Sequence, residues 1–202
     1  MTPFPFAGLF LGDAPLVLAS GSPRRAELLR LVGAEFEVVM PPEEPDPHDA
    51  WPHQVVMDLA RGKARGVAAT RPDAWVLGAD TLVWSRGRPL GKPEGREGAR
   101  EMLRELSGAW HEVYTGICLV RHGRSHQAWE RSLVRFVDLT DSQIDVYIAT
   151  GEPMDKAGAY GIQGFGALWV DRVEGCYFNV MGLPLSRLAR LFAEAARDRK
   201  TS

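Results

Sequence analysis

Apolar residues recur along the chain with two periods, which predict strands alternating with helices. Apolar runs at 16–19, 36–40 and 75–84 are typical of strands. Helical spacing of apolar residues predicts helices that begin near Pro23 and Leu185, and others over about 53–70, 96–107 and 141–149. This order of elements indicates an α/β protein with a mixed sheet.

Turn residues divide the remaining segments. The sequence RHGRS at 121–125 separates two strand-like runs, which predicts a β-hairpin. We interpret PPEEPDPHDAWP at 41–52 as a proline-rich acidic loop and SRGRPLGKPEG at 85–95 as a second loop. After the glycine-rich segment 151–167 we expect further short strands before the last helix.

Composition and charge restrict the class of protein. The 202 residues, 45% hydrophobic and 25% charged, suffice for one core or for two lobes that share a sheet. A formal charge of -2 disfavours a protein that binds nucleic acid through an overall basic field. No apolar run approaches the roughly 18 residues of a membrane span, so no membrane partner is expected.

Cysteine usage and the N-terminus complete the domain prediction. Cys118 and Cys176 lie outside any CxxC spacing, so we expect small core residues of a reducing, cytoplasmic environment. Residues 1–15 lack the basic start of a signal peptide and contain early prolines, which favours an N-terminal extension. We therefore expect a single domain over 16–198.

Two adjacent arginines follow the first predicted strand. Ser22 is the expected N-cap and Pro23 the first helical residue, so Arg24 and Arg25 lie in the first turn. The positive end of the helix dipole lies there, so two cations cost about several tenths of a kcal/mol each unless an anion joins them. The Ser-Gly-Ser turn also presents backbone N–H groups, which favours an oxyanion site. The alternative is that both arginines face solvent or pair with Glu27.

Asp80 is an acid in an otherwise apolar row. Alternation along the strand places it on one face with Val76, Gly78, Leu82 and Trp84. A buried carboxylate needs a partner, so a metal cation or a proton-transfer role would explain it. Gly78 beside it is expected to leave room for a ligand or an ion. Capping of a neighbouring loop is the alternative.

Two lysines and a glycine-rich segment are further candidates. Lys63 falls on the apolar stripe of the 53–70 helix, although its ammonium could extend to water. Lys92 precedes Pro93, which holds its backbone extended, although an isolated loop lysine is usually just solvated. The segment 151–166 combines glycines with polar side chains, a composition that suits a binding loop or merely turns.

Four motifs together resemble one family. ASGSPRRAELL, LGADTLV, LGKP and GEPMDKAGAYGIQG occur in this order within residues 16–192. The chain in this respect resembles the Maf family of nucleoside triphosphate pyrophosphatases. The resemblance implies a two-lobed α/β fold with a mixed β-sheet and flanking helices, similar to inosine-triphosphate pyrophosphatases, with the active site in the cleft between the lobes. It also implies a homodimer.

The resemblance further implies hydrolysis of a nucleoside triphosphate to the monophosphate and pyrophosphate, with Mg²⁺ or Mn²⁺ as cofactor. By match to the family, Asp80 is the proton acceptor, and we expect it also to be a metal ligand. Glu44 is our choice for a second metal carboxylate, with Glu43 and Asp46 as alternatives. The residues implied to bind the phosphates are Ser20, Ser22, Arg24, Arg25, Lys63 and Lys92.

Three positions bear on which nucleobase the substrate carries. Arg24, Thr81 and Gln163 match the branch of the family that prefers dTTP and UTP. The Gln163 amide offers a donor and an acceptor, which complement the O4 and N3–H of uracil or thymine. A flipped amide would serve cytosine, so exclusion of CTP is not predicted. Because the family is also connected with inhibition of septum formation, the alternative function is a nucleotide-binding regulator that acts through cell-division partners.

Overall fold

The computed structural model describes residues 14–42 and 50–198. Tertiary contacts divide them into two compact units. Unit 1 contains the described parts of 1–80, 115–130 and 182–202, and unit 2 contains 81–114 and 131–181.

The strands form one mixed sheet, which confirms the predicted fold class. They are β1 (Leu16–Ala19), β2 (Glu37–Val39), β3 (Trp75–Ser85), β4 (Arg88–Leu90), β5 (Trp110–Arg121), β6 (Arg124–Phe136) and β7 (Val170–Glu174). Their order is β2-β1-β3-β5-β6-β7, and β4 pairs with β3. Strand β1 is parallel to β2 and β3, whereas the β3–β4 and β6–β7 pairs are antiparallel. The predicted hairpin is present, with its turn at His122 and Gly123.

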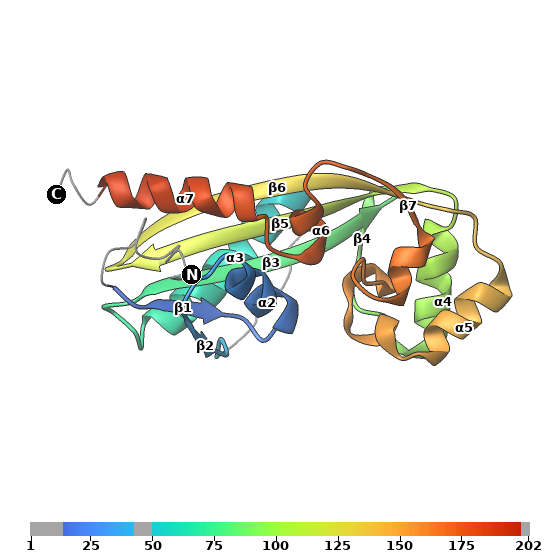
Figure 1. Ribbon diagram of the computed structural model, residues 1–202, viewed down its shortest axis with the longest axis horizontal. Coiled ribbons are helices and arrows are strands. Elements are labelled where there is room, and N and C mark those ends of the chain that lie inside the picture. The colour runs from blue at the N-terminus through green and yellow to red at the C-terminus, as the bar shows by residue number, and fades with distance from the viewer. Residues whose placement is uncertain (1–13, 43–49, 199–202) are drawn as a thin grey trace. The chain divides into compact units, whose positions relative to one another are not determined.

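All five predicted helices are present, and each boundary that was predicted lies within a few residues of the observed one. Figure 1 shows their arrangement within each unit. They are α2 (Pro23–Leu31), α3 (Pro52–Ala68), α4 (Gly95–Leu106), α5 (Asp141–Ala149) and α7 (Leu185–Asp198). The glycine-rich segment forms three 3₁₀ helices, η1 (Glu152–Asp155), η2 (Ala157–Ala159) and η3 (Phe165–Trp169). The expected further short strands are reduced to β7, because Tyr177–Met181 forms the short helix α6.

In unit 1, α3 packs directly on the sheet. Its backbone touches the strands at two glycines, because a Cβ at Gly116 would lie 2.2 Å from the Val56 carbonyl oxygen and one at Gly78 would lie 2.2 Å from that of Ala60. Cys118 lies in this core, as predicted, and burial raises the pKa of its thiol to about 12. Cys176, in unit 2, is only half-buried, so the core prediction for it is wrong.

In unit 2, α4 packs against α5 and the first two 3₁₀ helices. A buried aromatic cluster stabilises this unit: the Phe136 and Tyr160 rings lie 4.8 Å apart, edge to face, and His111 lies 5.3 Å from each. The His111 Nε2 is 2.8 Å from the Tyr160 hydroxyl. Burial lowers the pKa of His111 to about 4.

The prediction of a continuous loop over 85–95 is wrong, because β4 occupies part of it. Arg86 and Gly87 both have positive φ, at 47° and 80°, and form a two-residue turn that pairs Ser85 with Arg88. Pro89 lies within this short strand, and proline is tolerated in strands mainly at edges.

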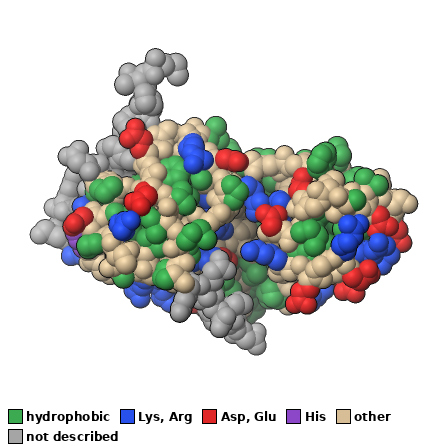
Figure 2. Space-filling model, turned by 90° about the horizontal axis from the view of Figure 1, so that it is seen from below, with side chains coloured by type: hydrophobic (Ala, Val, Ile, Leu, Met, Phe, Trp, Pro, Cys, Tyr) green, Lys and Arg blue, Asp and Glu red, His purple; other side chains and the backbone are tan. Residues whose placement is uncertain are grey.

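On the face that Figure 2 shows, Lys and Arg side chains are interspersed with Asp and Glu over the described surface. This distribution agrees with the near-neutral charge of the sequence. In the part of the chain that the structure describes, no helix has the length and apolar character needed to cross a bilayer.

Candidate functional site

The turn after β1 is fixed by a buried arginine of unit 1. Arg25, 8% exposed, donates from Nη1 to the Ser20 hydroxyl oxygen at 3.0 Å and from Nε to the Gly182 carbonyl at 2.9 Å. The Ser22 backbone N–H donates to the same Ser20 oxygen at 3.2 Å. Arg25 therefore holds the turn against the segment that precedes α7, and its guanidinium does not extend into solvent.

The start of α2 has the form expected of an anion site. Ser22 is the N-cap and Pro23 follows it, as predicted, but the Ser22 side chain makes no capping hydrogen bond among the described residues. The first turn contains no acidic residue, and Arg24 is half-buried in it. Gly21 lies beneath Met40, since a Cβ there would be 2.8 Å from the Met40 sulfur. Backbone N–H groups and the positive helix end thus coincide at this turn.

Lys63 and Asp80 form an ion pair in unit 1. Lys63 Nζ lies 2.7 Å from Asp80 Oδ1, and the two side chains are 8% and 16% exposed. Lys63 therefore faces the sheet, as its place on the apolar stripe predicts, and its ammonium does not extend to water. Its positive charge compensates a carboxylate that would be costly to desolvate alone.

The expectation that Gly78 leaves room for a ligand is wrong. The space above Gly78 is filled by α3, because a Cβ there would lie 2.2 Å from the Ala60 carbonyl oxygen and 2.8 Å from the Ala64 nitrogen. The glycine serves close packing of helix on strand. This packing brings the following turn of α3, with Lys63, to Asp80.

The strand register joins the turn and the ion pair at one edge of the sheet. Ala19, the last residue of β1, is aligned with Gly78 of the parallel strand β3, two residues before Asp80. Helix α2 starts at this same edge. Carboxyl ends of parallel strands are the usual place for ligands in open α/β sheets. Unit 1 therefore gathers a helix N-terminus, a buried arginine, a lysine and a carboxylate within one region.

The described residues include no group of three or more His, Cys, Asp or Glu side chains that could hold a metal. The Asp80 carboxylate nevertheless fits Mg²⁺ or Mn²⁺, because such ions are often held by one or two carboxylates together with substrate phosphates. Glu44, like its alternatives Glu43 and Asp46, lies outside the described residues. Their role as metal ligands stays a prediction.

Three predicted substrate-binding residues belong to unit 2. Thr81 follows Asp80 in β3 and, by alternation along the strand, is directed to the opposite face of the sheet. Lys92 is exposed beyond β4, next to Gly91, whose carbonyl accepts a hydrogen bond from the Gly158 N–H at 3.0 Å. Gln163 is exposed in a turn of the glycine-rich segment. Their contacts with a substrate stay predictions.

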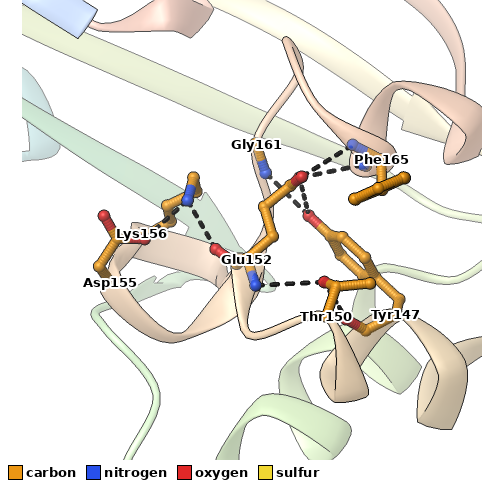
Figure 3. A network of polar contacts seen from close by, with 8 residues as sticks. Tyr147, Thr150, Glu152, Asp155, Lys156, Gly161 and Phe165 are labelled. Atoms are coloured by element: carbon orange, nitrogen blue, oxygen red, sulfur yellow. Dashed lines mark hydrogen bonds and ion pairs between the residues drawn. The ribbon is translucent and has the colours of Figure 1, made fainter. Parts of the chain in front are cut away.

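A tyrosine that the sequence did not single out supports the Gln163 turn. Tyr147 of α5 is 2% exposed, and its hydroxyl donates to Glu152 Oε1 at 2.8 Å (Figure 3). Buried tyrosines need a partner for their hydroxyl, but periodicity alone does not say which one. Glu152 and Lys156, two polar residues of the segment 151–166, are engaged in contacts within this segment.

Comparison with known proteins agrees with these motifs. The model of the family described as Maf-like protein matches residues 15–195. This chain belongs to that family. Among individual relatives, a Bacillus anthracis protein named dTTP/UTP pyrophosphatase is 48% identical over 176 residues, which are 87% of this chain and 92% of that protein. A Bacillus cytotoxicus protein of the same name is 51% identical over 175 residues, 86% of this chain and 92% of that protein.

A solved structure, the Ham1 protein of Staphylococcus aureus, is 12% identical to this chain. Its TM-score is 0.45, and the match covers 61% of this chain and 72% of Ham1.

Proposed function

We propose that this protein hydrolyses nucleoside triphosphates, with dTTP and UTP as the preferred substrates, to the monophosphate and pyrophosphate. The observation that carries this function is the identity of about half of all aligned residues with relatives named dTTP/UTP pyrophosphatase. These alignments span nearly the whole of both proteins, at 86–87% of this chain and 92% of each relative. The same names favour hydrolysis over the alternative role as a regulator of cell division.

The residues of unit 1 support a division of roles. Backbone N–H groups at the start of α2, the Ser22 hydroxyl and Arg24 would bind phosphate oxygens, while Arg25 keeps the turn in place. When substrate binds, the Lys63 ammonium group would turn from Asp80 toward the polyphosphate. Negative charge that develops on the phosphates would thus meet the positive side chains of Arg24 and Lys63.

Asp80 would accept the proton of the attacking water. The water oxygen bonds to the α-phosphorus, the bond from that phosphorus to the bridging oxygen breaks, and pyrophosphate leaves. Mg²⁺ or Mn²⁺, when bound, would neutralise charge on the phosphate oxygens, with Asp80 and Glu44 as the proposed ligands. Lys92 and Gln163 of unit 2 are proposed to bind phosphate and base.

A nucleotide panel tests this function. Pyrophosphate release from dTTP, UTP, CTP, ATP and GTP should be measured with Mg²⁺, with Mn²⁺ and with EDTA. We expect turnover of dTTP and UTP that exceeds that of the purine nucleotides by about tenfold or more and that EDTA abolishes. Release of pyrophosphate from none of the five nucleotides would contradict the function, whereas release that persists in EDTA would contradict only the metal requirement.

We also propose a homodimer, as the family resemblance implies, and a location in the cytoplasm, which the cysteine usage favours. Sedimentation equilibrium of the purified chain tests the oligomer, with a mass of one chain as the contradicting result.

A further inference from the structure

The Glu152 carboxylate turns inward and binds the turn that carries Gln163. Oε2 accepts a hydrogen bond from the Phe165 backbone N–H at 2.8 Å (Figure 3). Oε1 accepts one from the Gly166 N–H at 3.1 Å. Both donors lie just after Gln163. The Glu152 side chain therefore holds the backbone at the end of this turn.

Tyr147 fixes the beginning of the same turn. Its hydroxyl accepts the Gly161 N–H at 3.1 Å while it donates to Glu152 Oε1 at 2.8 Å. One carboxylate and one phenol thus connect residues 161 and 166 on either side of Gln163. We call this group, Tyr147 and Glu152 with the backbone of 161–166, the turn clamp.

Two glycines leave the space that the side chains of the turn clamp occupy. A Cβ at Gly164 would lie 2.1 Å from Glu152 Oε2, and one at Gly166 would lie 2.6 Å from the Tyr147 hydroxyl. Any larger residue at either position would displace the carboxylate or the phenol. The glycines at these two positions therefore serve close packing around Glu152 and Tyr147.

The turn clamp is charged. Burial alone would raise the pKa of Glu152, but hydrogen bonds from Tyr147 and from the backbone of Phe165 and Gly166 lower it below its ordinary value. Glu152 therefore accepts all three hydrogen bonds as a carboxylate, the form that binds N–H donors most strongly. Lys156 Nζ, which donates to the Glu152 carbonyl at 2.6 Å, holds the backbone of Glu152 itself.

Gln163 is exposed between the two fixed ends, with the buried Ile162 before it. The structure shows no hydrogen bond from the Gln163 amide to another described residue. The amide is thus presented on a rigid turn, and a group that recognises a base must be held rigidly to discriminate.

We infer that Glu152 is a positioning residue for base recognition: through the turn clamp it sets the place of the Gln163 amide and so the selection of a uracil or thymine base. This inference rests on the proposed function. Glu152 acts through Gln163 and does not itself touch the nucleotide. A misplacement of the amide by about 1 Å would weaken both of its hydrogen bonds to the base.

A double-mutant cycle on the full chain tests the inference. Glu152→Gln replaces one acceptor oxygen by an NH₂ group that would face backbone donors. We expect kcat/KM for UTP to fall about tenfold, mainly through KM, because ground-state binding of the base is lost. In a Gln163→Ala background the same change should lower kcat/KM less than about twofold, since the amide that the clamp positions is already absent.

Two measurements separate positioning from general damage. The inhibition constant of inorganic tripolyphosphate, which has no base, should be the same in Glu152→Gln as in the wild type. Tyr147→Phe, which keeps the ring but removes the hydroxyl, should raise the KM for UTP in the same direction. Glu101→Gln, a change of an exposed glutamate in α4, is the matched control and should leave KM unchanged.

The outcomes are distinct. Equal losses with and without Gln163, or an unchanged KM for UTP in both Glu152→Gln and Tyr147→Phe, would overturn the positioning role while the proposed function stands. A wild-type protein that releases no pyrophosphate from UTP would overturn the proposed function and this inference with it.

Discussion

The Ala60 carbonyl of α3 lies directly against Gly78 of β3, where a Cβ would be only 2.2 Å from the oxygen. Lys63 lies three residues after Ala60 on the same side of the helix, and Asp80 lies two residues after Gly78 on the same face of the strand. This close contact consequently sets the 2.7 Å distance between Lys63 Nζ and Asp80 Oδ1. Helix packing and the candidate catalytic group are therefore coupled.

Gly78→Ala should disturb both the packing of α3 on β3 and the Lys63–Asp80 ion pair. The new methyl group meets backbone atoms that cannot turn away, so α3 must shift outward, at a cost of about 3 kcal/mol in the free energy of unfolding. Denaturant unfolding measures this cost. Gly98→Ala in α4 is the control, because its Cβ would lie 3.8 Å or more from its neighbours and alanine favours helices. Equal stability of the Gly78→Ala variant and the wild type would contradict the packing described.

Arg25→Lys should loosen the turn after β1. A lysine cannot replace the two guanidinium hydrogen bonds, to Ser20 Oγ and to the Gly182 carbonyl, at once. We expect the free energy of unfolding to fall by about 2 kcal/mol, since a buried acceptor loses its donor. Arg30→Lys, at an exposed position of the same helix, should change it by less than about 0.5 kcal/mol. Similar effects at both positions would argue against an anchoring role of Arg25.

His111 should make stability sensitive to mild acid. Its pKa in the folded protein is about 4, below the ordinary 6.5, because burial disfavours the charged form. Between these values the unfolded chain binds a proton that the folded chain excludes, so stability rises with pH and is lost as the pH falls from about 6.5 to about 4. From pH 7.5 to pH 5 this loss amounts to about 2 kcal/mol.

Urea unfolding at the two pH values measures the loss. His111→Phe, which cannot titrate, should lose about 2 kcal/mol less than the wild type over the same interval. The same pH dependence in both proteins would show that His111 does not bind the proton.

Periodicity was sufficient for the helices and for the sheet class, because apolar residues at spacings of 3.6 and 2 define buried faces. It did not find β4, since Arg86-Gly87 is not among the common hairpin turn pairs and Pro89 argues against a strand. Helix α6 was also missed, because five residues at 177–181 are too few for a helical period to be visible.

The candidate site was predictable in parts only. The helix stripe placed Lys63 toward the core, and strand alternation marked Asp80 as an acid in an apolar row. Neither pattern says where a helix crosses a strand, so the close pairing of the two side chains had to come from the structure. The role of Gly78 was misread for the same reason: a glycine in a strand marks a close approach without identifying what approaches.

Pyrophosphate release from UTP by Asp80→Asn tests the central claim most directly. Asparagine keeps the shape of the side chain and an oxygen for Lys63, but it cannot take a proton from water. We expect release to fall by about 10³-fold or more while UTP still binds, whereas the exposed control Asp73→Asn should retain wild-type turnover. Turnover of the Asp80→Asn variant within about threefold of the wild type would contradict a catalytic role of Asp80.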